Sequence, residues 1–263
     1  MRFISLASGS KGNGYLVQAG EATVLVDAGL SAREMERRIQ LAGMASSRIN
    51  AILLTHEHSD HLHSAALLSR RLKVPVFGTE GTLSTPCGRI MPVRESTERI
   101  EILPAGETLN LGSLAITPFS ISHDASDPVG LVFSANGHRL VLAADVGCVT
   151  RLVSHRLAGA SAIILESNHC PEMLRHGHYP LWLQRRIAGR FGHLSNAEAA
   201  GLVREIHHAG LRHLVLAHLS ENNNTPRLAF EVMRAALDEI GSQTDLRVAR
   251  QEQIGNWIDL DEG

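Results

Sequence analysis

The chain has 263 residues, of which 44% are hydrophobic, so it is long enough to bury a sizeable core. Its formal net charge is −2, which is no global signature of a protein that binds polyanions. The three cysteines lack CxxC spacing, which argues against both a disulfide framework and a cysteine-based zinc site.

The sequence shows no internal division and no membrane segment. No linker rich in proline, glycine and serine and no repeat is visible, which predicts one domain over residues 1–263. Residues 1–7 hold too short an apolar stretch for a secretory signal, and no apolar run approaches the roughly 20 residues of a membrane helix. We therefore expect a soluble, cytoplasmic protein without a membrane partner. The sequence does not indicate an oligomeric state.

Short strand patterns separated by turn residues open the chain, and we expect strands over residues 2–6, 14–18 and 23–26. Ser31 has the pattern of a helix N-cap, and Glu34 completes a capping box, which predicts a helix over 32–42. The apolar run 51–55 then predicts a buried strand that leads into a group of histidines.

The segment after this strand places four potential metal ligands in six residues: His56, His58, Asp60 and His61. Strand side chains alternate with a period of two, so the first three share a side, whereas His61 needs a local turn to join them. Imidazole and carboxylate suit zinc and neighbouring divalent metals. The alternative is a loop of solvated histidines, but ordinary loops favour Gly, Pro, Asn, Asp and Ser. The segment thus favours a metal-dependent hydrolase.

The rest of the chain mixes strand and helix patterns. Further strands are predicted over 74–78, 114–119, 131–135, 139–143, 162–166 and 214–217. Further helices are predicted over 62–71, from Ser195 to about residue 209 and from Pro226 to about residue 240. Asn136-Gly137 is a strong hairpin signal. Strand-rich blocks with intervening helices suit a layered α/β or α+β architecture.

Several strand patterns end in a metal-competent side chain: Asp27, His123, Asp145 and His218. Each alone is weak evidence, because Asp after a strand is more often a turn residue and an isolated histidine is more often structural. A common site at one edge of the sheets explains all four. In one arrangement Asp145 bridges two ions and Asp27 orients a ligand imidazole. The ions are then held by His56, His58 and His123 and by Asp60, His61 and His218.

These motifs, in this order, resemble those of the metallo-β-lactamase-fold hydrolases and span nearly the whole chain. The HxHxDH pattern of residues 56–61 is highly specific for that superfamily. The resemblance implies a four-layer αββα sandwich, a layered α+β fold, with a dinuclear site at one edge of its two sheets. It also implies the ligand arrangement just given. The fold alone does not select a substrate, because it hosts hydrolysis of lactams, thioesters and phosphodiesters.

Four narrower segments are similar to the YycJ (WalJ) branch of that superfamily: 7–13, 166–169, 192–196 and 218–223. Members of that branch are associated with 5′ to 3′ exonuclease action on double-stranded DNA. The resemblance therefore implies a phosphodiesterase that acts as a 5′ to 3′ DNA exonuclease. Cys170 stands where an acidic residue is expected in this branch, a departure that affects no metal ligand.

Two of these segments also resemble motifs of the β-CASP nucleases: Glu166-Ser167 resembles their acidic motif, and Gly192-His193 with Ser195 their Gly-His-x-Ser motif. By that analogy Glu166 supports a metal-ligating histidine. His193 then contacts the scissile phosphate or protonates the leaving oxygen. The alternatives are an ion-pair or cap residue for Glu166 and a cap-region residue for His193.

Residues 173–197 contain no Asp or Glu. They include four arginines, which form either a surface for the DNA backbone or a helix face turned to water: Arg175, Arg185, Arg186 and Arg190.

The sequence leaves the substrate and the metal open. A small-molecule hydrolase of the same fold, acting on a cyclic phosphodiester or a thioester, fits the same ligands, and the near-neutral pI favours it slightly. A non-catalytic metal-binding module is disfavoured, because all seven ligand positions are filled. Zinc and manganese are the expected metals, and iron is a further candidate.

Overall fold

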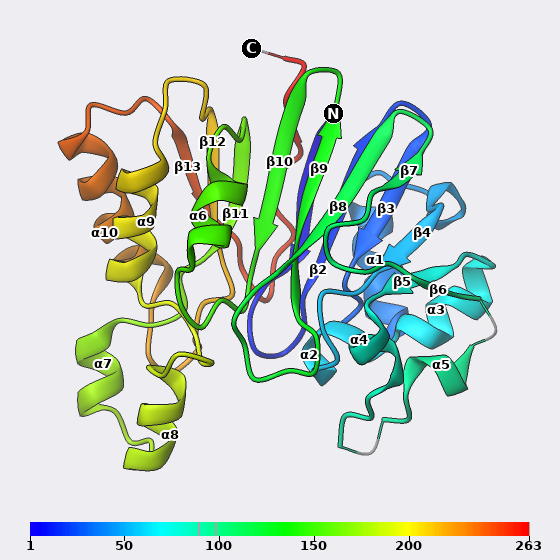
Figure 1. The fold of residues 1–263 in the computed structure, drawn as a ribbon, viewed down its shortest axis with the longest axis horizontal. Coiled ribbons are helices and arrows are strands. Elements are labelled where there is room, and N and C mark those ends of the chain that lie inside the picture. Colours follow the sequence, from blue (N-terminus) through cyan, green and yellow to red (C-terminus); the bar gives the residue numbers. More distant parts are fainter. Residues whose placement is uncertain (89, 98, 263) are drawn as a thin grey trace.

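The computed structural model describes every residue except 89, 98 and 263. In the described part of the chain, two seven-stranded sheets pack face to face, and helices cover the outer face of each (Figure 1). This arrangement confirms the expected four-layer αββα sandwich. Of the helices described, none is both long and apolar enough to cross a bilayer.

The first sheet is built mainly from the N-terminal part of the chain. Its strands, in spatial order, are β14 (Ile258–Asp259), β1 (Arg2–Ala7), β2 (Gly14–Ala19), β3 (Ala22–Val26), β4 (Ala51–Leu53), β5 (Val76–Gly78) and β6 (Ile100–Ile102). Strands β1 to β3 pair antiparallel, and β3 to β6 pair parallel. Because parallel strands end at the same edge, the residues that follow β3 and β4 lie side by side.

The second sheet has the same division into antiparallel and parallel parts. Its strands, in spatial order, are β13 (Asp245–Val248), β12 (His213–Ala217), β11 (Ala162–Glu166), β10 (His138–Ala143), β9 (Val129–Ala135), β8 (Leu114–Ser120) and β7 (Leu109–Leu111). Strands β10 to β13 pair parallel. Asn136 and Gly137, at φ 53° and 77°, make the predicted hairpin turn between β9 and β10.

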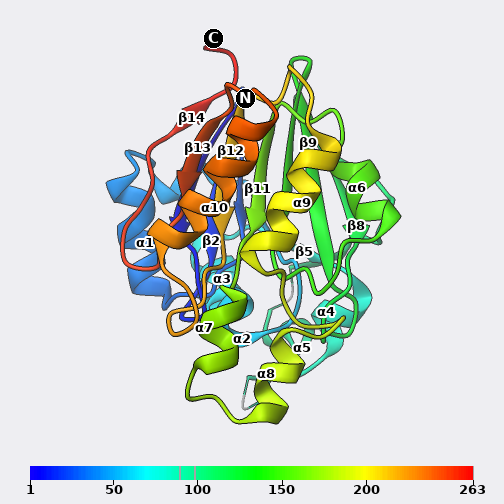
Figure 2. The same ribbon diagram turned by 90° about the vertical axis from the view of Figure 1, so that its left-hand side faces the viewer.

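The longer helices form the outer layers (Figures 1 and 2). Helices α1 (Ala32–Leu41) and α3 (Ala65–Leu72) pack on the first sheet, and α6 (Arg151–Leu157), α9 (Asn196–Ile206) and α10 (Pro226–Glu239) pack on the second. The predicted capping box of Ser195 and Glu198 is present at the start of α9. The shorter helical segments are η1 (Ser46–Arg48), α2 (Ser59–Leu62), α4 (Glu80–Ser84), α5 (Val93–Ser96), α7 (Pro171–His176) and α8 (Leu181–Ile187).

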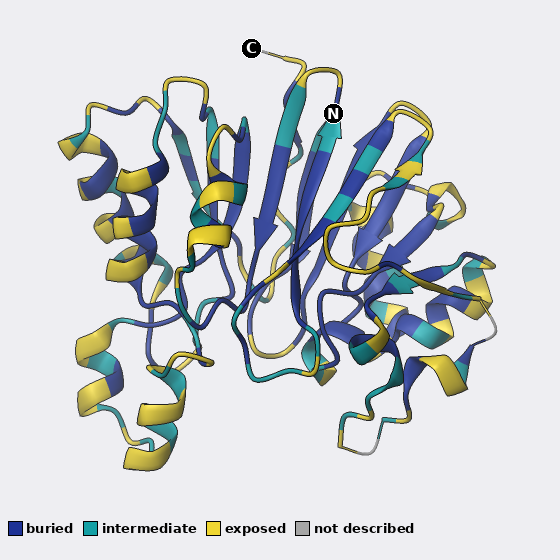
Figure 3. Cartoon of the chain, viewed as in Figure 1, coloured by how far each residue is buried: buried dark blue, intermediate teal, exposed yellow. Residues whose placement is uncertain are grey.

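The central strands β9 to β12 of the second sheet are largely buried on both faces (Figure 3). In β10, Leu140 and Leu142 point into the core between the sheets, whereas Val141 and Ala143 point toward the helices. This period-two alternation between two apolar cores explains why the strands are continuous apolar runs in the sequence.

The structure breaks the predicted helix over 62–71 into two pieces. Helix α2 begins earlier, at Ser59, and α3 begins at Ala65. Between them, the backbone N–H and the side chain of Ser64 both donate hydrogen bonds to the carbonyl of Ala28. These tertiary bonds replace the helical ones at this point. The short turn of α2 is the local turn that His61 needs in order to join the other histidines.

Candidate metal centre

The candidate site lies at the edge of the sandwich where the parallel strands end. Asp27 follows β3, Asp145 lies two residues after β10, and His218 follows β12. All three have left-handed backbones, with φ of 58°, 55° and 52°, and they are three of the five non-glycine residues with positive φ in the described chain. Such backbones cost of order 1 kcal/mol or more and persist where the surroundings fix them, typically at functional sites.

The first group of candidate donors consists of three histidines. His56 lies three residues after β4, His58 is the residue before α2, and His123 lies three residues after β8. One ring nitrogen from each lies within 4.8 Å of the others. His58 Nδ1 and His123 Nε2 are 3.3 Å apart. These atoms are close enough to share one ion.

The second group consists of Asp60, His61 and His218, whose ligand atoms also lie within 4.8 Å of one another. Asp60 Oδ2 is 3.5 Å from His61 Nε2 and 3.5 Å from His218 Nε2. Asp145 connects the two groups, because its Oδ2 lies 3.1 Å from His61 Nε2 and it also forms a group with His56 and His61. The structure thus brings together all seven residues that the sequence singled out as ligands.

Two buried atoms support a fit to metal ions. His56 Nε2 is buried and has no hydrogen-bond partner among the described residues, and Asp145 Oδ2 is buried without a hydrogen bond of suitable geometry, although it lies 3.1 Å from His61 Nε2. A buried polar atom without a partner costs about 1–3 kcal/mol, so a cation at this position would satisfy both atoms. Imidazole and carboxylate donors suit divalent transition metals. The residues present therefore fit the ions that the motif implies.

The charges of the cluster favour a cation as well. Burial alone would raise the pKa of the Asp145 carboxyl, but His218 and His61 hold it well below its usual range. Burial alone would lower the pKa of His218, but Asp145, Asp60 and Glu166 together raise it to about 10. The carboxylates thus stay negative in a buried position, where they stabilise positive charge.

Asp27 and Thr55 hold His61 and His56 in place. Asp27 Oδ2 lies 2.8 Å from His61 Nδ1. The Thr55 N–H donates to Asp27 Oδ1 at 2.9 Å, and the Thr55 hydroxyl lies 3.0 Å from His56 Nδ1. Asp27 therefore occupies the orienting position expected for it. Thr55 was not singled out by the sequence, where its only signal is its place between the strand and His56.

Glu166, at the end of β11, contacts two histidines at once. Its Oε1 lies 2.7 Å from His193 Nδ1 and 3.1 Å from His218 Nδ1. Its Oε2 accepts hydrogen bonds from the backbone N–H groups of Val146 and Leu194. Glu166 therefore orients both imidazoles and also joins the two loops that carry Asp145 and His193.

His193 faces the same pocket as the candidate ligands. Burial alone would lower the pKa of His193, but the Glu166 and Asp145 carboxylates together raise it. The pocket has a volume of about 280 Å³ and is lined by Ser10, His58, Asp60, Asp124, Asp145, Leu183, Arg186, Ile187, Gly192, His193 and His218.

Asp124 and Asn13 are further site residues that the ligand motifs did not identify. The Asp124 carbonyl lies 3.2 Å from His58 Nε2, and its carboxylate pairs with Arg186. Asn13 is fully buried, and its Nδ2 lies 3.0 Å from His61 Nε2. The Asn13 side chain therefore packs against His61 in the interior of the site.

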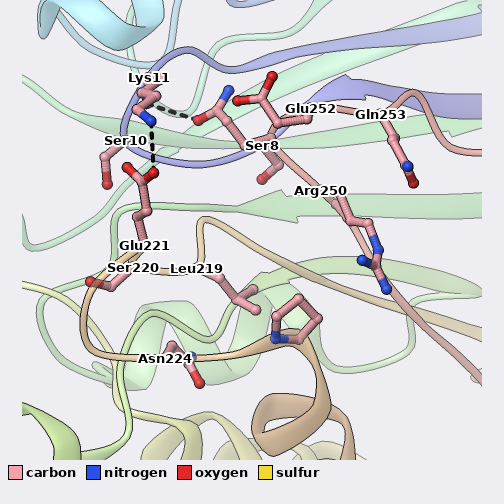
Figure 4. A pocket seen from close by; sticks show the side chains of 13 residues that line it. Ser8, Ser10, Lys11, Leu219, Ser220, Glu221, Asn224, Arg250, Glu252 and Gln253 are labelled. Atoms are coloured by element: carbon pink, nitrogen blue, oxygen red, sulfur yellow. Dashed lines mark hydrogen bonds and ion pairs between the residues drawn. The ribbon is translucent and has the colours of Figure 1, made fainter.

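A second cavity, of about 320 Å³, adjoins this pocket at Ser10, which lines both (Figure 4). It lies between the N-terminal loop, the segment after β12 and residues 249–253. Two of its lining residues pair, because Lys11 Nζ donates to Glu221 Oε1 at 2.7 Å (Figure 4). The charge of Lys11 is thus balanced by a carboxylate of the neighbouring loop.

Comparisons with known proteins agree with this geometry. Residues 22–219 match the "Beta-lactamase superfamily domain". Exodeoxyribonuclease YycJ of Bacillus anthracis is 36% identical over 241 residues, which cover 92% of this chain and 90% of that protein. Exodeoxyribonuclease WalJ of Streptococcus pneumoniae is 31% identical over 94% of this chain and 93% of that protein. The structure of Zn²⁺-bound PqqB from Methylobacterium extorquens is similar in fold, with a TM-score of 0.72 and 22% identity, over 99% of this chain and 100% of that one.

Proposed function

The chain belongs to the metallo-β-lactamase superfamily and, within it, to the YycJ/WalJ family of metal-dependent hydrolases, and from this premise we propose a two-metal DNA exonuclease that acts 5′ to 3′. The observation that carries the proposal is the convergence of seven candidate ligands, six of them grouped around Asp145, with His193 facing the same pocket. The names of the two relatives support DNA as the substrate.

Two sets of residues would hold the ions, with Asp145 shared between them. His56, His58 and His123 form one set, and Asp60, His61 and His218 form the other. Bound divalent ions supply a water of lowered pKa and positive charge for the phosphate oxygens. Asp27 and Glu166 support the reaction indirectly, because each accepts a hydrogen bond from the Nδ1 of a ligand histidine and so fixes its ring.

His193 is the candidate proton donor to the leaving oxygen. Its Nδ1–H donates to Glu166 at 2.7 Å, which fixes the ring and leaves Nε2 for a substrate atom in the pocket. A carboxylate partner also stabilises the protonated imidazole, which is the form that can donate a proton.

Zinc or manganese is the proposed metal, and iron fits the same donors, because imidazole and carboxylate ligands accept all three. We place the protein in the cytoplasm. Both relatives are bacterial proteins, and a bacterial cell keeps its DNA in the cytoplasm.

A gel assay with labelled duplex DNA tests the function. The wild-type protein should release a 5′ label at once as a short product, and a 3′-labelled duplex should give a ladder. Single-stranded DNA, RNA and a chromogenic phosphodiester complete the substrate set, and Asp145→Asn is the inactive control. Hydrolysis of the chromogenic diester without any DNA cleavage would instead indicate the alternative, a small-molecule phosphodiesterase.

A further inference from the structure

Two exposed aromatic side chains flank the segment that lines one side of the site. Trp182 is 65% exposed on α8, and Phe191 is 59% exposed just before Gly192. Between them, Leu183, Arg186 and Ile187 line the pocket that contains His193. Both rings are more exposed than Phe230, which is 39% exposed on the outer side of α10.

Helices α7 and α8 extend beyond the outer helical layer, on the same edge of the sandwich as α2 (Figures 1 and 2). Most of their residues are exposed (Figure 3). The sandwich itself therefore does not cover Trp182. Its ring lies on a projection beside the site.

The arginines of this projection differ in their partners. Arg175 pairs with Glu172, and Arg186 pairs with Asp124 beside the site. Arg185 and Arg190 are both exposed, and neither pairs with a carboxylate in the part of the chain that the structure describes. Residues 173–197 contribute no acidic side chain of their own. The projection therefore presents positive charge that the described carboxylates leave unbalanced.

The helix places the ring and the charges together. Residues three and four apart are neighbours on a helix, so Trp182 lies beside Arg185 and Arg186. Because Arg186 lines the pocket, this side of α8 is continuous with the site. An exposed indole next to arginines matches a strand of nucleic acid, in which a base stacks on the ring and phosphates contact the guanidinium groups.

We propose that Trp182 and Arg185, here termed the α8 surface, bind the DNA strand beside the scissile bond, with one unstacked base on the Trp182 ring and an adjoining phosphate on Arg185. This inference rests on the proposed nuclease function and names the element that holds the flanking nucleotides. A stacking platform accepts every base, so the surface gives affinity for an unpaired strand without sequence preference.

The first test compares Trp182→Ala with the wild type on two substrates. For each protein, kcat/KM is measured for a 5′-overhang DNA and for a chromogenic phosphodiester. The ratio of the two values should fall about 5- to 100-fold in Trp182→Ala, the range for loss of one base stack. Trp182→Phe should restore most of the ratio. Phe230→Ala is the matched control, because it removes another exposed aromatic ring, from α10, and should leave the ratio unchanged.

A second test locates the stacked base. A single abasic residue is moved through the first positions of the overhang. At one position the abasic residue should lower kcat/KM of the wild type. At that position it should not lower kcat/KM of Trp182→Ala, in which the stacking ring is already absent. Arg185→Ala should lower the dependence of kcat/KM on salt. Arg204→Ala, which removes a cation that pairs with Glu239, should not.

The outcomes separate this inference from the nuclease proposal. If the wild type cleaves the chromogenic diester but no DNA, the nuclease proposal fails. If the wild type cleaves DNA, Trp182→Ala retains the wild-type ratio, and the abasic residue has the same effect on kcat/KM in both proteins at every position, the α8 surface does not bind the strand. A protein that sediments as a dimer and becomes a monomer in Trp182→Ala would overturn the inference too, because the ring would then lie between two copies.

Discussion

Asp145 and the histidines around it define the site at the scale of single residues. Asp145 Oδ2 and His56 Nε2 are buried without a hydrogen bond of suitable geometry among the described residues, whereas the Nδ1 atoms of His61 and His218 each contact a supporting carboxylate. The supporting carboxylates thus contact one nitrogen of each of these two rings, and the other nitrogen, Nε2, lies 3.5 Å from Asp60 Oδ2. Such an arrangement prepares a centre for cations before any cation binds.

His58→Ala should remove one ligand of the first histidine group and lower activity at least a hundredfold. We expect the metal content per chain to fall at the same time. Elemental analysis and the duplex assay measure both quantities. His63→Ala is the matched control, because His63 lies two residues from the cluster and is exposed. Full activity in His58→Ala would show that the histidine group has no part in catalysis.

The sequence identified the seven candidate ligands because each lies in a compact motif or directly after a strand. It did not identify Thr55 or Asp124. Their contacts with His56 and His58 depend on backbone positions that only the folded chain brings together. A threonine and an aspartate are also common in ordinary turns, so neither residue type stood out.

At the scale of elements, strong local patterns predicted the structure well. The capping box at α9 and the Asn136-Gly137 hairpin are present as expected. The helix predicted over 62–71 was wrong in its boundaries, because Ser64 bonds to Ala28 instead of continuing a helix. Short edge strands such as β6 and β14 carry too few residues for a recognisable alternation.

The capping box of α9 makes a prediction about stability. The Ser195 side chain accepts from the Glu198 N–H, and the Glu198 carboxylate accepts from the Ser195 N–H. Ser195→Ala should lower the free energy of unfolding by about 0.5–2 kcal/mol. Ser195→Thr keeps the cap and should lose much less. Urea titration monitored by circular dichroism measures both, and equal losses in the two variants would rule out the cap as the cause.

Glu34 links α1 to its surroundings and predicts a dependence of stability on pH. Hydrogen bonds from Arg37 and Arg38 lower the pKa of Glu34 from 4.5 to about 2, and buried Arg38 also donates to the carbonyls of Leu6 and Gln251. A carboxyl group whose pKa is lowered in the folded state stabilises the fold at pH values above its ordinary pKa. This stabilisation is lost as the pH falls toward the lowered pKa.

The stability difference between the wild type and Glu34→Gln should therefore be largest above pH 4.5 and shrink as pH falls toward 2. Urea unfolding of both metal-free proteins, from pH 6 downward, measures the difference. Because both proteins keep the same histidines, protonation at the candidate metal site cancels in the comparison. A difference that stays constant across this range would assign the effect of the substitution to packing.

At the scale of the whole molecule, one core joins the two sheets. Tyr15 and Val17 of the first sheet and Phe133 and Leu140 of the second belong to the same buried cluster. The candidate site takes ligands from both sheets, so its geometry depends on this packing. We propose on this basis that residues 1–263 fold as one domain.

Phe133→Ala should test that proposal. Removal of a fully buried aromatic ring should cost about 3–5 kcal/mol and shift the whole transition. Tryptophan fluorescence and far-ultraviolet circular dichroism should still report one coincident transition. Phe230→Ala, on the exposed side of α10, should cost far less. Two separated transitions would show that the sheets unfold independently.

The central claim, a hydrolase that needs two metal ions, is tested most directly by metal analysis combined with a duplex-DNA assay. The purified protein is analysed for metals, treated with a chelator, assayed, and assayed again after zinc or manganese is returned. We predict about two ions per chain, loss of activity after chelation and recovery with one of these metals. Full cleavage of duplex DNA by protein shown to be free of metal would contradict the claim.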